Sequence, residues 1–248
     1  KFGNAPDFDS GDGTVTVWDG AEDGTAWEQM VYQYSTTADI DSISSSNVWD
    51  TVDIVVEWLD SNYDLVSQTV TLNWQTRVAL TTPLLRCFRA YNNNSTDLLW
   101  HVIVYVNWAI TNGVPDDTTT IRAIIDPINQ QTEMAIYTIP NGKTGYMKSY
   151  YCTQVDAAVR PASVDFSLWA ADRDNGYEFH LKHQIGVPEQ GEPFIYPFWV
   201  PVKFNQKTDI KITALPEDQA AKETEVPAVT ESSEDVAEKP ETDKETEA

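Results

Sequence analysis

The residues best suited to chemistry begin with three aspartates in the segment PDFDSGDG, residues 6–13. An EF-hand loop places side-chain oxygens at positions 1, 3 and 5, a glycine at position 6 and a glutamate at position 12. Counted from Asp7, position 5 is Gly11, position 6 is Asp12 and position 12 is Trp18. The spacing therefore favours a solvated Asp/Gly turn that leads into a strand over a calcium loop.

Two other groups of titratable residues resemble catalytic or metal-binding sets. His180 and His183 are three residues apart, and on a regular strand an odd separation puts the two rings on opposite faces. Such rings cannot chelate one ion, so we expect structural or surface histidines. Asp172 and Asp174 have the residue types of a glycosidase carboxylate pair, but a charged turn between two strands explains them more simply.

The sequence has no motif of nucleophilic or phosphate chemistry. It contains no G-x-S-x-G elbow, no P-loop and no G-x-G-x-x-G fingerprint. Cys87 and Cys152 lie far apart in strand-like runs. Their number suits neither a disulfide framework nor a zinc site, so we expect buried free thiols, with one bridge between strands as the alternative. The sequence therefore predicts no enzyme and assigns no catalytic, metal-binding or cofactor-binding residue.

Nine tryptophans and eleven tyrosines raise the question of an aromatic platform for sugars. Two tryptophans, Trp169 and Trp199, alternate with the apolar residues of their strands and are expected to be exposed. Together with Tyr177 they are the candidate ligand-facing rings. Four tryptophans on apolar strand faces are expected in the core: Trp58, Trp74, Trp100 and Trp108.

The elements that position these residues are strands, because apolar residues alternate along most of the chain. Pro197 and Pro201 lack a donor for ladder hydrogen bonds, so their strand should be at a sheet edge or bulged. Asn141 and Gly142 predict a tight hairpin turn. About ten such strands predict an antiparallel β-sandwich, for which a jelly roll is one possible arrangement. The clearest period-two runs are 52–58, 100–108, 164–168 and 194–204.

The charge distribution limits the partners and divides the chain. The net charge of -23 disfavours nucleic acid and anionic membranes, and no stretch reaches the ~18 apolar residues that span a bilayer. From Pro216 onward there are twelve acidic residues, three lysines and no aromatic residue. This composition predicts a disordered acidic C-terminal tail over 216–248. We expect an extended N-terminal arm over 1–20 and the sandwich over 21–215.

Several segments together resemble a family of uncharacterised virion-associated proteins of tailed phages, especially marine ones. The resemblance covers about residues 2–214, and its most specific parts are TIPNGKT and KTDIKI. In contrast to that family, the acidic tail follows Leu215 directly, without one further apolar strand, which predicts an open sheet edge. The matching segments are FGNAPDFDSG with VWDG, WLDSNYDLVSQTVTLN, MAIYTIPNGKTGY, FHLKHQIG and VPVKFNQKTDIKITA.

The resemblance implies a structural or accessory protein of the virion, used in head decoration, at the neck or with fibres. Such a protein acts by protein–protein assembly, binds copies of itself and other virion proteins, and is assembled in the host cytoplasm. The family supplies no catalytic residues. A carbohydrate-binding module for attachment to a host glycan is the alternative function, and it would use the three candidate rings.

Overall fold

The computed structural model describes residues 2–6, 8–21, 29–154, 163–173, 176–188 and 193–217. The chain divides into two compact units, Lys1–Asp218 and Gln219–Ala248, and the described residues all belong to the first. Their regular elements are strands, apart from a 3-10 turn at Thr118–Thr120, and none of them forms a helix able to cross a lipid bilayer. The strand pairs are antiparallel, so the predicted antiparallel all-β class is confirmed.

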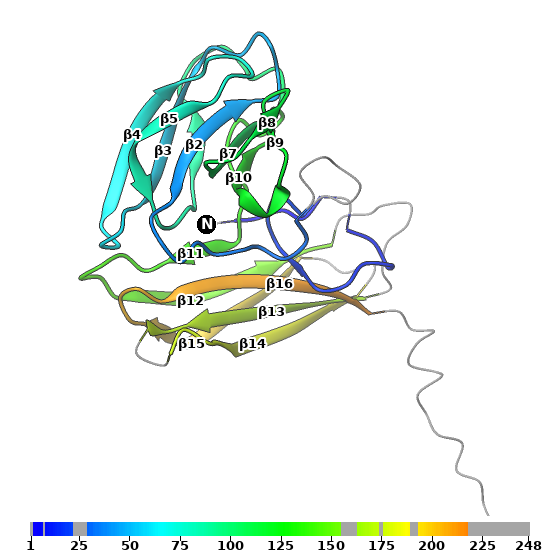
Figure 1. Ribbon diagram of the computed structural model, residues 1–248. Helices are drawn as coiled ribbons and strands as arrows, with labels where there is room; N and C mark the ends of the chain where they lie inside the picture. The colour runs from blue at the N-terminus through cyan, green and yellow to red at the C-terminus, as the bar shows by residue number, and fades with distance from the viewer. Residues whose placement is uncertain are drawn as a thin grey trace, which may run out of the picture. The chain divides into compact units, whose positions relative to one another are not determined.

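Residues 40–125 form two sheets that pack against each other (Figure 1). One sheet has the strand order β10-β7-β2-β5 and the other has the order β4-β3-β6. Ile43 of β2 and Ile54 and Trp58 of β3 lie in one buried core, as expected for alternating apolar residues. The bounds are β2 Ile40–Ser45, β3 Asp53–Leu59, β4 Leu65–Thr71, β5 Val78–Leu84, β6 Ala90–Asn92, β7 Val102–Val106 and β10 Ile121–Ile125, with a small hairpin of β8 Ile110–Thr111 and β9 Val114–Pro115.

The later strands form a second pair of layers, seen in the lower part of Figure 1. In the larger sheet, β16 is central, with β13 and then β14 on one side and the short strands β1 and β11 on the other. The smaller layer is the pair β12–β15. The bounds are β1 Val15–Thr16, β11 Ile136–Thr138, β12 Gly145–Cys152, β13 Ser163–Ala171, β14 Phe179–Pro188, β15 Phe194–Phe204 and β16 Asp209–Glu217.

Strand β15 is both at an edge and bulged, as its two prolines predicted. Among the described strands it pairs with β12 alone. Met147 of β12 lies opposite Val202, whereas Ser149, two residues later, lies opposite Pro197. The additional residues of β15 between Pro197 and Val202 are therefore extruded from the ladder.

The N-terminal segment is not the extended arm expected over residues 1–20. Val15 and Trp18 are completely buried, and β1 pairs with β16 of the main sheet. The Trp18 Nε1–H donates to the carbonyl of Gln29 at 3.0 Å. The alternating apolar residues that follow the Asp/Gly turn thus complete the core of this chain, and the domain boundary at residue 20 is wrong.

The turn at Asn141 and Gly142 forms, but it does not close the hairpin that its sequence predicts. The Lys143 N–H donates to the Pro140 carbonyl at 3.2 Å, and Gly142 adopts a φ of 69°. The flanking strands separate, because β11 pairs with β16 while β12 pairs with β15. A glycine with positive φ at the third position suits a type II turn, which here carries the chain from one sheet to the other.

The expected tail does not begin at residue 216. Pro216 and Glu217 belong to β16 and pair with Val164 and Ser163 of β13. The rest of the tail, from residue 218 onward, lies outside the described residues.

Candidate functional site

The aspartates of the N-terminal segment form a local turn where the structure describes them. The Asp9 N–H donates to Asp12 Oδ2 at 2.9 Å, and the Gly11 N–H donates to Asp9 Oδ1 at 2.7 Å. These bonds are those of an Asp/Gly turn, in agreement with the sequence. Asp7 lies outside the described residues, and the described part of the chain contains no group of three metal-ligating side chains.

The expectation that His180 and His183 lie on opposite faces of a strand is wrong. His183 lies opposite Leu168 and His180 lies opposite Ala170, so both histidines share the face of those two residues. A β-bulge in β14 beside Leu168 and Trp169 adds a residue and reverses the alternation.

His183 has a structural environment, as expected. Its Nδ1 lies 2.5 Å from the Tyr150 hydroxyl, and its ring contacts those of Tyr196 and Phe198. Of the proposed carboxylate pair, the structure describes Asp172, which accepts a hydrogen bond from Asn205 Nδ2 at 3.2 Å. Asp174 lies outside the described residues.

The three candidate ligand-facing rings do not form one platform. Leu168 of β13 and Phe198 of β15 pack between the layers, and Trp169 and Trp199 alternate with them, so the two indoles point in opposite directions. Trp199 is 99% exposed in the β15 bulge. Trp169 is half-buried, and its Nε1–H donates to Thr213 Oγ1 at 2.9 Å. Tyr177 is fixed in the β13–β14 turn, with its hydroxyl 2.8 Å from that of Tyr63.

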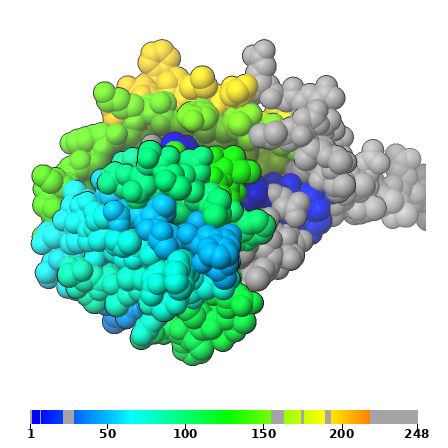
Figure 2. Space-filling view, turned by 90° about the horizontal axis from the view of Figure 1, so that it is seen from above, coloured from blue at the N-terminus to red at the C-terminus, as the bar shows by residue number. Residues whose placement is uncertain are grey.

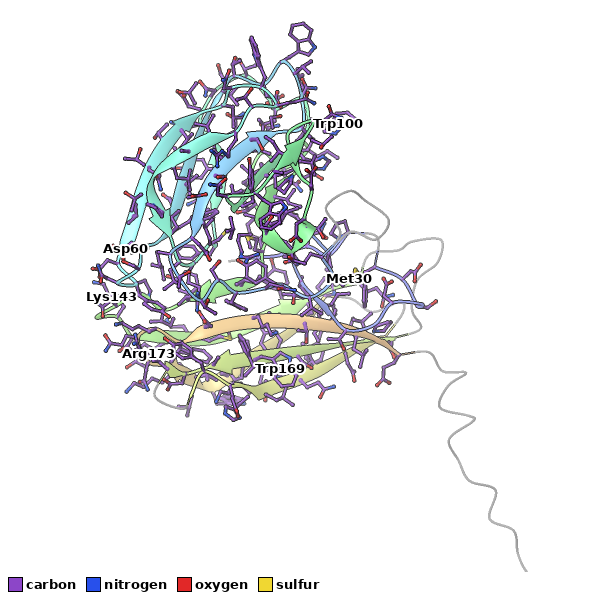
Figure 3. The ribbon with its side chains drawn as sticks, viewed as in Figure 1. Met30, Asp60, Trp100, Lys143, Trp169 and Arg173 are labelled. Atoms are coloured by element: carbon purple, nitrogen blue, oxygen red, sulfur yellow. The ribbon has the colours of Figure 1, made fainter. Side chains whose placement is uncertain are left out.

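Three exposed tryptophans lie in loops at one end of the β2–β10 half. Of the four tryptophans expected in the core, Trp58 is buried, but Trp74, Trp100 and Trp108 are 52%, 53% and 51% exposed. Trp49 is 73% exposed in the β2–β3 loop. Figure 3 shows Trp100 on this half of the unit, away from Trp169. Trp108 follows β7 and lies beyond the opposite end of that strand from Trp100, so we call the group Trp49, Trp74 and Trp100 the tryptophan end.

Asp50 connects the loops of the tryptophan end. This buried residue follows Trp49, and its carbonyl accepts the Trp74 N–H at 3.0 Å. Its carboxylate accepts the Leu99 N–H, beside Trp100, at 3.0 Å and the Ser45 hydroxyl at 2.6 Å. Asp50 therefore fixes the three loops relative to one another, the Trp74 loop through its backbone carbonyl and the Trp100 loop through its carboxylate.

The turn between β8 and β9 packs against the tryptophan end. Gly113 approaches the Ser45 carbonyl so closely that a side chain at this position would overlap it. Its φ of 80° also favours glycine. Asn107, beside Trp108, accepts a hydrogen bond from Arg77, three residues after Trp74.

A second surface feature is an apolar groove of about 1160 Å³ in the β11–β16 half. Its floor is the inner face of the main sheet, with Phe166, Ile212 and Ala214. Along one side it is lined by the whole of β12, and along the other by residues 2–6 and Phe8. The N-terminal wall is held close to β11, since a Cβ at Gly3 would collide with the backbone of Ala135.

Every residue of β12 lines this groove, and one edge of β12 has no strand partner among the described residues. Its strand partner among the described residues is β15, on the opposite side. Backbone N–H and C=O groups on such an edge can pair with a further extended chain. The last described strand, β16, is paired on both sides, so the open edge lies on β12 and not at the end of the chain's last strand.

The groove carries no reactive thiol. Cys152 at its end and Cys87 in the other half are both buried thiols that form no disulfide, which confirms thiols and not a bridge. Burial raises the pKa of the Cys152 thiol to about 12, and burial likewise raises the pKa of the neighbouring Tyr150 hydroxyl. Both groups are neutral at pH 7, so the groove presents apolar surface and backbone hydrogen-bonding groups, which suit binding more than catalysis.

Comparisons of the chain with protein-family models, with curated proteins and with solved structures find no match.

Proposed function

We propose that this chain is a non-enzymatic structural protein of a tailed-phage particle and that it assembles by accepting an extended strand of a neighbouring virion protein. The observation that carries the proposal is the apolar groove beside the unpaired edge of β12. An added strand would pair with that edge through its backbone. Its alternate side chains would enter the groove, which is the usual division of roles in strand addition.

The dimensions of the groove favour a polypeptide over a small molecule. Strand β12 has eight residues, which at ~3.3 Å per residue corresponds to a site about 26 Å long. The groove volume, about 1160 Å³, exceeds the ~300–1,000 Å³ of ordinary small-molecule pockets. An extended segment of similar length would use both the edge and the floor.

The charge distribution favours an apolar or weakly charged strand. Residues 143–215, which include β12, contain eight acidic and eight basic side chains, whereas residues 40–125 contain nine acidic and four basic ones. The segment that bears β12 therefore has no net charge that would repel a charged partner.

The assignment to a virion rests on the sequence resemblance to phage proteins, and the antiparallel all-β fold is compatible with it. Other virion proteins and further copies of this chain are the proposed partners, in particles assembled in the host cytoplasm. Head decoration, neck and fibre positions would each be compatible with strand addition.

Photo-crosslinking inside assembled particles tests the groove. Ser149→p-benzoylphenylalanine places the probe on β12, in the lining of the groove. The matched control is Ser67→p-benzoylphenylalanine on exposed β4 of the other half. We expect Ser149 to give one discrete adduct with a virion protein and Ser67 to give none.

The two parts of the proposal fail in different ways. Mass spectrometry of gradient-purified particles that lack this chain would contradict the virion assignment. Particles that contain the chain but give an adduct from Ser67 and none from Ser149 would contradict the groove.

A further inference from the structure

The tryptophan end is a second surface with its own ligand, independent of the groove and of the proposed function. Its three indoles are 52% to 73% exposed and come from three separate loops (Figure 2 looks onto this half from above). Large aromatic side chains gain most from burial, so a gathering of this kind on a surface usually marks a binding site.

Hydrogen bonds hold these loops in one arrangement, as a binding surface requires. Asp50 joins the loops of Trp49, Trp74 and Trp100 through bonds of 3.0 Å to two backbone N–H groups. Trp74 itself adopts a φ of 54°, a conformation that side chains other than glycine rarely take. Strained residues persist where the surroundings hold them, and they gather at ligand sites. The loops therefore lose little conformational entropy when a ligand binds.

The polar neighbours of the indoles indicate the chemistry of the ligand. Exposed Asn73 and Thr76 flank Trp74, and Asn47 is two residues before Trp49. Amides and hydroxyls beside flat apolar rings match a molecule that has an apolar face and a hydroxylated rim. A pyranose ring has both, and a chain of such rings would bind several separate indoles.

Charge disfavours the anionic alternatives. Residues 40–125, the half that carries the three tryptophans, hold nine acidic and four basic side chains, a net charge of -5. Nucleic acids, anionic membranes and sulfated or uronic polymers would be repelled at ordinary ionic strength.

We propose that the tryptophan end binds a neutral polysaccharide, by stacking of its sugar rings on Trp49, Trp74 and Trp100. This assignment replaces the sugar platform expected from Trp169, Trp199 and Tyr177. The role of Asp50 is to position the loops, since its carboxylate is buried and bonded within the protein.

Affinity electrophoresis of the full chain tests the proposal with defined neutral polymers: dextran, laminarin, mannan and hydroxyethylcellulose. Heparin serves as the anionic comparison. We expect at least one neutral polymer to retard the protein and heparin to have no effect. Trp49→Ala and Trp100→Ala should each weaken the retardation at least tenfold, because each removes one stacking ring.

Trp199→Ala is the matched control, because it removes an exposed indole on the other half. Its retardation should equal that of the unmodified chain, and all three variants should keep the same melting temperature. Two results would overturn the proposal: no retardation by any of the four neutral polymers, or an equal loss in Trp199→Ala. Binding of another protein at Trp49 and Trp100 without any response to the polymers would likewise assign the surface to a protein partner.

Discussion

Arg86 and Asp209 form a two-point ion pair in the interior of the protein. Arg86 Nε and Nη2 donate to the two carboxylate oxygens of Asp209 at 2.8 Å each. The Thr138 hydroxyl donates to the same carboxylate at 2.5 Å, and Arg86 Nη1 donates to the Ser35 carbonyl at 2.6 Å. The pair joins the segment after β5 to the start of β16, so it connects the two pairs of layers.

Removal of one charge from this pair should destabilise the fold strongly. Asp209→Asn leaves the Arg86 guanidinium buried without its counter-charge, and we expect the free energy of unfolding to fall by about 3–5 kcal/mol. Urea unfolding at pH 7, followed by tryptophan fluorescence, measures the loss.

The exposed ion pair between Arg89 and Glu57, at 3.1 Å, provides the control. Glu57→Gln should cost less than about 1 kcal/mol, because solvent already screens this pair. If Asp209→Asn prevents folding, the double variant Arg86→Met with Asp209→Leu should restore it, since neither charge remains buried. A loss for Asp209→Asn no larger than that for Glu57→Gln would contradict the interpretation.

The buried N-terminal segment gives a second prediction. Deletion of residues 1–20 removes Val15 and Trp18 from the core, and the loss of a buried tryptophan alone costs about 3–5 kcal/mol. We expect this variant to melt without cooperativity in circular dichroism. Deletion of residues 1–12, which leaves β1 intact, should melt cooperatively at a modestly lower temperature. Equal melting of the full chain and the longer deletion would mean that β1 is dispensable.

Alkaline pH should destabilise the protein. Burial raises the pKa values of Tyr32, Tyr34 and Tyr63. Below pH ~10, the ordinary pKa of tyrosine, both states are protonated and the stability is complete. Above it, the unfolded chain loses protons first, so the free energy of unfolding falls, by up to about 1.4 kcal/mol per pH unit for each fully buried group.

Urea unfolding at pH 7, 9 and 10.5 checks this prediction. The midpoint should be similar at pH 7 and 9 and clearly lower at pH 10.5. Absorbance at 295 nm should show that some of the eleven tyrosines ionise only when the chain unfolds. Ionisation of all of them near pH 10 in the folded protein would be inconsistent with their burial.

The cysteines should be inert while the protein is folded. Cys87 and Cys152 are both buried, and the pKa of about 12 leaves very little Cys152 thiolate at pH 8. Ellman's reagent at pH 8 should label neither thiol in the native protein and both in 6 M guanidinium chloride. Rapid labelling of the native protein would contradict this, and one intact bridge in the non-reduced protein would show that the thiols are not free.

Sequence periodicity predicted the buried residues correctly where the strand extends over the whole run of alternating apolar residues. Val164 and Leu168 alternate on β13 and both lie inside, as their spacing required. The same rule failed for Trp100 and Trp108, because β7 covers only Val102–Val106 and both tryptophans lie beyond its ends. Apolar residues alternate in the sequence beyond both ends of β7, but the strand itself ends there. The indoles of Trp100 and Trp108 are therefore exposed.

Other features had no local signal in the sequence. The β14 bulge reverses the faces of His180 and His183 without any proline or glycine to mark it. The Arg86–Asp209 pair joins residues 123 positions apart, and no pattern in the sequence around either residue indicates a buried charge. Asp50 resembles any loop aspartate in the sequence, although it connects three loops of the tryptophan end.

The central position of β16 has a consequence for the synthesis of the protein. This last described strand pairs with β1, near the beginning of the chain, as well as with β11 and β13. A nascent chain on the ribosome therefore cannot complete its main sheet until residue 217 has left the exit tunnel. Until then β1 and β13 lack their shared neighbour, and exposed strand edges are prone to aggregate. Pairings so distant in sequence also fold slowly, so expression at low temperature should raise the soluble yield.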